Sequence, residues 1–189
     1  MSHSAKIILI TGASSSGKSE FAEALAQQLD RSITYIATAT MDENDREWQA
    51  KIIKHQQRRP KTWKTVMANT NLPAYLDRAD PTECLLIDSL GTWIANYLEL
   101  EPAQWQKTRD RFLSSLTTTA AMTILVGEET GWGVVPAYAM GRLFRDRLGY
   151  LSSKIGNIAD TTYLVAGGHV LNLSLLGEPL SKYGIRSPN

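Results

Sequence analysis

The chain has 189 residues, with 20 Lys and Arg residues against 19 Asp and Glu residues. One domain over residues 1–189 is expected at this length, and the near balance of charge gives no support for a nucleic-acid partner recognised by bulk charge. The first apolar run, Ile7 to Ile10, is too short for a signal-peptide core or a membrane span, so we expect a cytoplasmic protein. Cys84 is the only cysteine, which excludes an intrachain disulfide and a thiolate metal cluster.

Six short β-prone runs alternate with stretches of helical character. The runs cover residues 7–11, 33–37, 62–66, 84–88, 122–127 and 161–166. Several are continuously apolar, a pattern typical of strands whose sheet is covered by helices on both faces. Helices are expected at 20–29, 104–116 and 137–158, the last with a clear apolar stripe. The sequence therefore predicts an α/β fold with a mostly parallel sheet flanked by helices, and a loosely held C-terminal tail from about residue 175.

The strongest motif follows the first predicted strand, where residues 12–19 read GASSSGKS. Two glycines five positions apart, followed by Lys and Ser, form the pattern of a phosphate-binding loop. Its backbone N–H groups and the positive end of the following helix attract a polyphosphate, Lys18 reaches the β and γ phosphates, and the Ser19 hydroxyl ligates Mg²⁺. The predicted nucleotide-binding residues of the loop are Gly12, Ala13, Ser14, Ser15, Ser16, Gly17, Lys18 and Ser19. The motif predicts a P-loop fold that binds a purine nucleoside triphosphate.

An acidic residue, Asp88, ends the apolar run CLLID. A carboxylate at the end of a buried strand commonly holds the Mg²⁺ of a phosphate-loop protein, directly or through water. Asp88 could also be the N-cap of the helix that begins near Leu90, and the two roles are compatible. We predict Ser19 and Asp88 as the metal ligands.

A histidine, His55, lies in the stretch IIKHQQRRP, at the end of a predicted helix that carries Trp48 and Ile52. By composition alone, a histidine in such a place is more often a partly buried surface residue than a catalyst. Arg58 and Arg59 follow closely, and two guanidinium groups beyond an imidazole could hold a polyphosphate against it.

The sequence as a whole resembles the adenosylcobinamide kinase / adenosylcobinamide-phosphate guanylyltransferase family, bifunctional enzymes of cobalamin biosynthesis. The resemblance covers roughly residues 7–173 and rests on ordered blocks. The blocks are GASSSGKS at 12–19, YIATA at 35–39, HQQRRP at 55–60, IDSLGTWIANYL at 87–98, EETGWGVVP at 128–136, RLFRDRLG at 142–149 and ADTTYLVAGG at 159–168.

The resemblance implies two reactions on a corrinoid. The protein would phosphorylate the aminopropanol hydroxyl of adenosylcobinamide with ATP or GTP, and Lys18 would be catalytic. It would then transfer GMP from GTP through a guanylylated His55, giving adenosylcobinamide-GDP. The resemblance also implies Mg²⁺ as cofactor, a homotrimer, and further nucleotide contacts at Ala37, Thr38, Ala39, Gln56, Gln57, Arg58, Arg59 and Asp88.

The sequence departs from the family pattern at several positions. Met67 stands where a glutamate associated with nucleotide binding is usual, and Ser89 stands where Cys is common. Glu128 replaces the usual Asn, whereas Glu129 keeps an acidic position and is a candidate metal or substrate contact. Ser152 and Ser153 stand where Asn-Gln is typical. Loss of an acceptor at position 67 affects the expected strength or base selectivity of nucleotide binding.

Two other readings of the sequence remain open. A monofunctional P-loop kinase of small molecules would carry the same loop but would form no nucleotide adduct on His55. A non-catalytic nucleotide-binding regulatory module would bind nucleotide without turning over adenosylcobinamide.

Overall fold

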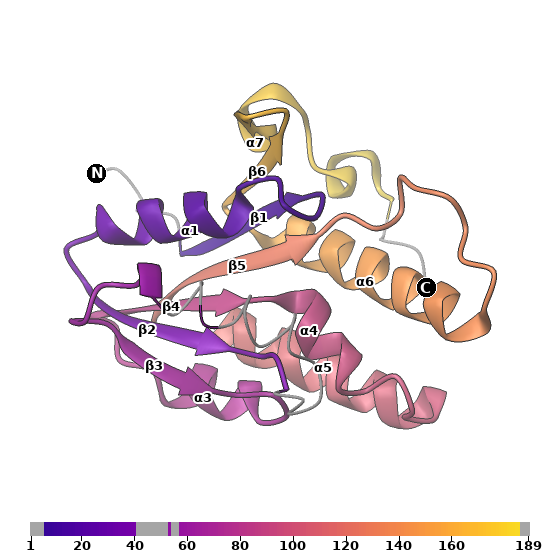
Figure 1. The fold of residues 1–189 in the computed structure, drawn as a ribbon, viewed down its shortest axis with the longest axis horizontal. Coiled ribbons are helices and arrows are strands. Elements are labelled where there is room, and N and C mark those ends of the chain that lie inside the picture. Colours follow the sequence, from indigo (N-terminus) through magenta and orange to yellow (C-terminus); the bar gives the residue numbers. More distant parts are fainter. Residues whose placement is uncertain (1–5, 41–52, 54–56, 186–189) are drawn as a thin grey trace.

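A seven-stranded sheet runs through the computed structural model, which describes residues 6–40, 53 and 57–185 (Figure 1). The strands are β1 (Ile7–Gly12), β2 (Ser32–Ala37), β3 (Lys64–Met67), β4 (Glu83–Asp88), β5 (Met122–Glu128), β6 (Thr161–Ala166) and β7 (His169–Asn172). Their order in the sheet is β3-β2-β4-β5-β1-β6-β7. All neighbouring strands pair parallel except β6 and β7, which pair antiparallel.

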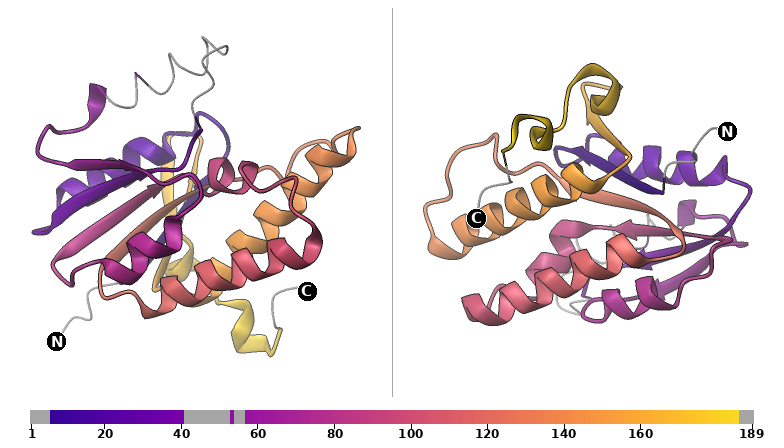
Figure 2. Two further views of the ribbon diagram at one scale, coloured as in Figure 1. Left: turned by 90° about the horizontal axis from the view of Figure 1, so that it is seen from below. Right: turned by 180° about the vertical axis from the view of Figure 1, so that it is seen from behind.

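Helices cover both faces of this sheet. The helices are α1 (Lys18–Gln27), α3 (Leu72–Arg78), α4 (Leu90–Ala95), α5 (Pro102–Thr118), α6 (Ala139–Ile158) and α7 (Leu173–Leu176), followed by the 3₁₀ helix η1 (Leu180–Tyr183). Helix α1 packs on one face, and α3 to α6 gather on the other (Figures 1 and 2). Successive side chains of a strand point to opposite faces, so β1 sends Leu9 into the core under α6 and Ile10 into the core under α1. This double covering explains why the central strands are apolar throughout.

The structure confirms the predicted α/β fold and each predicted strand, with ends that differ by two residues or fewer. Several features were not predicted, among them helix α3, strand β7 and the N-cap of α4. Strand β7 returns beside β6 through Gly167 and Gly168, which both have positive φ, so the region after residue 167 contains a hairpin and α7. In addition, Ser89 rather than Asp88 is the N-cap of α4, because the Ser89 side chain accepts a hydrogen bond from the Thr92 N–H. No helix in the described residues is long and apolar enough to cross a membrane.

The topology brings the carboxyl ends of four strands to one edge. Strand β5 lies between β1 and β4, so Glu128 ends between the loop that follows Gly12 and the carboxylate of Asp88. Strand β2 pairs with β4 on its other side and places Ala37 beside Asp88. In parallel α/β sheets, ligands bind outside this edge.

An aromatic cluster anchors α4 and α5 beneath that edge. Trp93 is fully buried, and its ring centroid lies 4.7 Å from that of Phe112, 5.2 Å from Tyr97 and 5.9 Å from Trp105. The guanidinium of Arg147 on α6 lies over Trp105 and donates to the Tyr97 carbonyl at 2.7 Å. The cluster therefore ties α4, α5 and α6 together.

Replacement of Trp93 by Ala should lower the free energy of unfolding by about 3–5 kcal/mol, because it leaves a large cavity at the centre of this cluster. Circular dichroism during denaturant unfolding measures the change. Leu175→Ala is the control, since Leu175 is 82% exposed and its truncation should change stability by no more than about 0.5 kcal/mol. Equal stability of the Trp93 variant and the wild type would contradict the role of the cluster.

Candidate functional site

The loop from Gly12 to Ser19 connects β1 to α1 and has a backbone that depends on its small residues. Gly17 has φ of 92° and Ser15 has φ of 58°, both in the left-handed region. A Cβ on Gly12 would lie 2.4 Å from the Val165 carbonyl oxygen and 2.7 Å from Ser16 Oγ. Glycine at position 12 therefore allows the loop to turn directly against β6.

The start of α1 has the chemistry of an anion site. Lys18 is only 8% exposed, and its Nζ donates to the Ala13 carbonyl at 3.2 Å, so the ammonium group folds back across the loop. Ser16 Oγ is buried without a hydrogen-bond partner in the described part of the chain. Helix N-termini carry unpaired N–H groups and a partial positive charge. A phosphate group would satisfy these donors and the Ser16 hydroxyl together.

Asp88 is oriented by a tyrosine of the neighbouring strand. The Tyr35 hydroxyl donates to Asp88 Oδ2 at 2.7 Å, and Tyr35 is 2% exposed. Burial, followed by the nearby Asp88 charge, raises the pKa of the Tyr35 phenol, so the hydroxyl keeps its proton and remains a donor. Among the described residues no other donor reaches this carboxylate, which leaves Oδ1 available to a cation.

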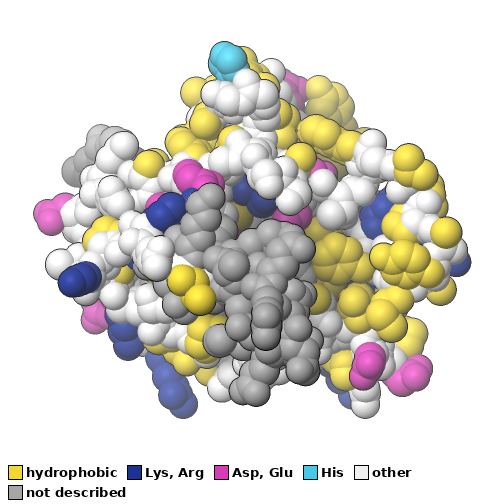
Figure 3. Space-filling view, in the orientation of Figure 1, with side chains coloured by type: hydrophobic (Ala, Val, Ile, Leu, Met, Phe, Trp, Pro, Cys, Tyr) yellow, Lys and Arg dark blue, Asp and Glu magenta, His cyan; other side chains and the backbone are white. Residues whose placement is uncertain are grey.

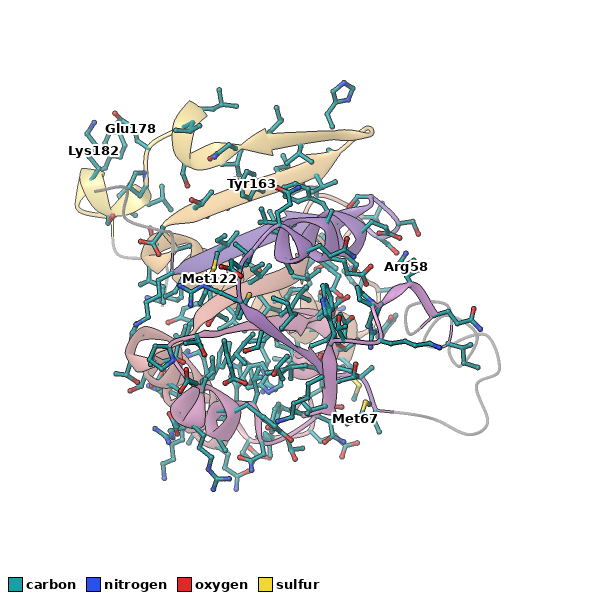
Figure 4. All side chains as sticks on the ribbon, turned by 90° about the vertical axis from the view of Figure 1, so that its left-hand side faces the viewer. Arg58, Met67, Met122, Tyr163, Glu178 and Lys182 are labelled. Atoms are coloured by element: carbon teal, nitrogen blue, oxygen red, sulfur yellow. The ribbon has the colours of Figure 1, made fainter. Side chains whose placement is uncertain are left out.

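The two arginines of the HQQRRP block dock on different partners. Arg58 forms ion pairs with Glu20 and Glu23 of α1, the second at 3.4 Å. Arg59 stacks its guanidinium on the Tyr35 ring, 3.4 Å from the centroid. Burial is the main cause that raises the pKa of Glu23, and the Arg58 charge acts against it. Figure 4 shows Arg58 and Met67 on the same side of the molecule, away from Glu178 and Lys182.

The segment 37–39 follows β2 at the same edge. Thr38 is fully buried, and its hydroxyl donates to the Ser89 carbonyl at 2.6 Å. Its backbone carbonyl accepts from Asn96 Nδ2 at 2.9 Å. The Thr38 side chain is thus committed to the protein, and the neighbouring Ala37 and Ala39 could offer a nucleotide hydrogen bonds only through their backbone.

Two glutamates lie where β5 ends. Glu129 accepts from Thr11 Oγ1 at 2.8 Å, and its backbone N–H donates to the Gly12 carbonyl at 2.9 Å. Glu128 accepts from the Gly91 N–H at 2.9 Å and from the Ser89 hydroxyl. Burial raises the pKa of Glu128, while the Ser89 hydrogen bond and the Lys18 charge lower it. Glu128 therefore joins the phosphate loop to the start of α4.

The remaining departures from the family pattern lie further out. Met67 ends β3, the edge strand, and is 46% exposed. Ser152 lies on α6 near Gly127, and its Oγ is buried without a partner in the described part of the chain. The structure offers no specific explanation for Ser153.

The structure brings most of the predicted site residues to one edge of the sheet. Residues 12–19, 37–39 and Asp88 lie where strands end at this edge, Arg58 contacts α1 and Arg59 contacts Tyr35. Gln57 is exposed. His55 and Gln56 lie outside the described residues. Tyr35, Glu23 and the Ser89–Glu128 contact were not predicted. For Tyr35 a signal existed, because it opens the YIATA block, but its partner could be identified only from the register of β2 and β4.

The described residues contain no group of three or more His, Cys, Asp and Glu side chains that could hold a metal ion. A magnesium ion that travels with a nucleotide needs fewer protein ligands, since phosphate oxygens and water supply the rest. The Ser19 hydroxyl and Asp88 Oδ1 are hard oxygen donors of the kind that Mg²⁺ prefers. The donor set therefore fits a nucleotide-bound magnesium ion.

A likeness in fold extends to the ATPase of a bacterial type III secretion system. That structure superposes with a TM-score of 0.56 at 10% identity over 90% of this chain, which spans about half of the ATPase (53%). At this identity the match concerns the fold alone. It supports the predicted α/β fold with a mostly parallel sheet.

The sequence comparisons are more specific. The family described as cobinamide kinase / cobinamide phosphate guanyltransferase matches residues 8–173. The bifunctional adenosylcobalamin biosynthesis protein CobP of Pseudomonas aeruginosa is 38% identical over 91% of this chain and 98% of its own. The bifunctional adenosylcobalamin biosynthesis proteins CobU of Escherichia coli and Salmonella typhimurium are 31% and 32% identical, each over 86% of this chain and 96% of its own. The chain belongs to the cobinamide kinase / cobinamide phosphate guanyltransferase family.

Proposed function

We propose that this protein phosphorylates the aminopropanol hydroxyl of adenosylcobinamide and then transfers GMP from GTP to the resulting phosphate. The observation that carries the proposal is the convergence of Lys18, Ser19 and Asp88 at one sheet edge, in a chain that aligns along almost its whole length with bifunctional relatives. ATP and GTP are the proposed phosphoryl donors, and GTP is the donor of GMP.

In the kinase step, the acceptor hydroxyl oxygen attacks the γ phosphorus. A bond forms between that oxygen and phosphorus, the bridging bond to the β phosphate breaks, and the hydroxyl proton is lost to the surrounding solution. The loop amides of residues 12–19 and the Lys18 ammonium stabilise the charge on the phosphate oxygens. Ser19 and Asp88 would hold the Mg²⁺ that accompanies the nucleotide, which would supply positive charge to offset that of the phosphate oxygens.

In the transferase step, the His55 imidazole attacks the α phosphorus of GTP and releases pyrophosphate. The phosphate made in the first step then attacks the same phosphorus and regenerates the imidazole. A neutral imidazole is a good nucleophile near pH 7, and the covalent route divides one difficult displacement into two easier ones. Support comes from Arg58 and Arg59, which follow His55 closely in the sequence. Their guanidinium groups contact α1 and Tyr35, respectively.

The assembly is proposed to be a homotrimer in the cytoplasm. Support for association comes from an exposed apolar patch on the β5–α6 connection and the first turns of α6. Its members are Trp132, Val134, Val135, Tyr138, Met140 and Leu143. In Figure 3 hydrophobic side chains gather at the right of the view, over this part of the molecule. Trp132 is 73% exposed and Val134 is 94% exposed, so burial against another subunit would remove much apolar surface from water.

Replacement of Lys18 by Ala should weaken triphosphate binding and slow the kinase step by about 10³-fold, because it removes a charge that stabilises phosphoryl transfer. Calorimetric titration with nucleotide and turnover assays on adenosylcobinamide measure the two effects. Lys107→Ala, on α5, is the matched control and should behave as the wild type. Unchanged kinase turnover in the Lys18 variant would show that the loop is not the active site.

Incubation with GTP labelled at the α phosphate should leave an acid-labile adduct on the wild type, and the adduct should be missing in His55→Ala. A phosphoramidate on imidazole explains the acid lability. His169→Ala is the control and should be labelled normally, since His169 lies on β7 beside Gly167. If the wild type takes no label, the transferase half of the proposal fails and a monofunctional kinase remains.

Sedimentation velocity should show a trimer for the wild type and smaller species for the double variant Trp132→Ser and Val134→Ser, because polar side chains weaken an apolar interface. Leu175→Ser with Leu176→Ser is the control, since both residues are highly exposed on α7 but lie outside the patch. A monomeric wild type would remove the trimer proposal. A trimer that withstands the patch variant would assign the interface to another surface.

A further inference from the structure

Three strands meet in a hydrogen-bonded network at Ser89. Thr38, just after β2, donates its hydroxyl to the Ser89 carbonyl at 2.6 Å and accepts from the Ser89 N–H at 2.8 Å. Glu128, at the end of β5, accepts from the Ser89 hydroxyl. Both the main chain and the side chain of Ser89 are therefore held, from opposite sides, by the two strands that flank β4. We refer to Thr38, Ser89, Gly91 and Glu128 as the Ser89 brace.

The packing of the brace leaves little freedom. Ser89 is 4% exposed and Thr38 is fully buried. Glu128 Oε2 accepts from the Gly91 N–H at 2.9 Å, and a Cβ on Gly91 would lie 2.4 Å from the same oxygen. The carboxylate therefore packs directly on the backbone of α4, where only glycine leaves room for it. Both oxygens of Glu128 are occupied by partners that flank the start of this helix.

Two of the departures noted in the sequence contact each other here. Ser89 stands where Cys is common in the family, and Glu128 stands where Asn is usual. A serine hydroxyl is a stronger hydrogen-bond donor than a thiol, and a bond to a carboxylate is stronger than a bond to a neutral amide. The bond between the Ser89 hydroxyl and the Glu128 carboxylate is therefore stronger than a contact between Cys and Asn at these positions would be.

Asp88 is the residue that the brace can affect. It immediately precedes Ser89, and its Oδ2 already accepts from the Tyr35 hydroxyl. Thr38 and Glu128 hold Ser89 and thereby the adjoining backbone of Asp88, while Tyr35 holds Oδ2, so the position of the Asp88 carboxylate is constrained from both ends. Glu128 itself is paired in register with Gly12, the first residue of the phosphate loop. The brace therefore sets the separation of the loop and the Asp88 carboxylate.

We infer that Glu128 and Ser89 are positioning residues that hold Asp88 in place for the magnesium ion of the nucleotide. The inference rests on the proposed function for its metal and its nucleotide. Neither residue contacts substrate in this role, and both act through Asp88. Partners that orient a metal ligand change metal affinity or activity by about 10- to 100-fold when they are removed. A residue that only caps α4 would instead lower stability and leave the magnesium requirement unchanged.

The test uses Glu128→Ala, Ser89→Ala, the double variant and the conservative Glu128→Gln. A fluorescent GTP analogue is titrated with Mg²⁺, and kinase turnover on adenosylcobinamide is followed over the same Mg²⁺ range. Each Ala variant should raise the half-saturating Mg²⁺ concentration by about 10-fold or more, and the double variant should exceed the larger single effect by less than about 3-fold. For Ser89→Ala, which removes no charge, nucleotide affinity without Mg²⁺ should change little.

The half-saturating Mg²⁺ concentration of Glu128→Gln should stay within about 3-fold of the wild-type value. The amide carbonyl of Gln can accept from the Gly91 N–H, while its NH₂ group donates to the Ser89 hydroxyl. Glu83→Gln is the matched control, because Glu83 lies at the amino end of β4, whereas the site lies at the carboxyl end of this strand. Circular dichroism confirms that each variant is folded. If Glu128→Ala does not fold, Ser89→Ala carries the same test through its lost bond to Glu128, and the stability of this variant also reports the lost N-cap contact with Thr92.

Three results would overturn the inference. The half-saturating Mg²⁺ concentration of the folded Ala variants could stay within about 2-fold of the wild type, or the increases caused by the two single variants could multiply in the double variant. In the third result, Glu128→Gln raises this concentration as much as Glu128→Ala does. Failure of the proposed function has a different signature. In that case the wild type would still bind the GTP analogue with full dependence on Mg²⁺ but would not phosphorylate adenosylcobinamide.

Discussion

The parallel arrangement of β1, β5 and β4 is the constraint on which the rest of the structure depends. Parallel strands end at the same edge, so the phosphate loop after Gly12 and the carboxylate of Asp88 meet there although they are far apart in the chain. Both faces of such a sheet must be covered, and α1 on one side with α3 to α6 on the other provides this cover. The apolar core thus holds the polar edge in a fixed geometry.

Buried polar groups at this edge are matched to partners. The Tyr35 hydroxyl meets Asp88, the Thr11 hydroxyl meets Glu129, and the Ser89 hydroxyl meets Glu128. Each pair satisfies a group that would otherwise be costly to bury, and a fully satisfied network is more rigid than its separate pairs. In the described part of the loop the Ser16 hydroxyl has no partner, and Lys18 donates to the Ala13 carbonyl of the loop itself. Their arrangement is what an incoming phosphate group would complete.

The segment after residue 57 connects this edge to the region that carries His55. Arg58 is tied to α1 by Glu20 and Glu23, and Arg59 is stacked on the ring that orients Asp88. A change in the position of this segment would therefore alter the contacts of Arg58 with α1 and those of Arg59 with Tyr35, which donates to Asp88.

The sequence alone determined the elements whose signals are local. The phosphate loop was recognised because its conformation needs glycine and its chemistry needs Lys18 and Ser19, and α6 because its apolar residues recur at helical spacing. Strand β7 was missed although Gly167 and Gly168 form a recognised hairpin signal, because the strand is short and its exposed residues lack a buried face.

Contacts between distant residues were decided only by the tertiary structure. The choice of Ser89 over Asp88 as the cap of α4 depends on Thr92 and on Glu128, which is 39 residues away from Ser89. The same holds for Tyr35 and Asp88, separated by 53 residues. A sequence records which hydrogen-bonding groups are present, but the register of the sheet determines which of them meet.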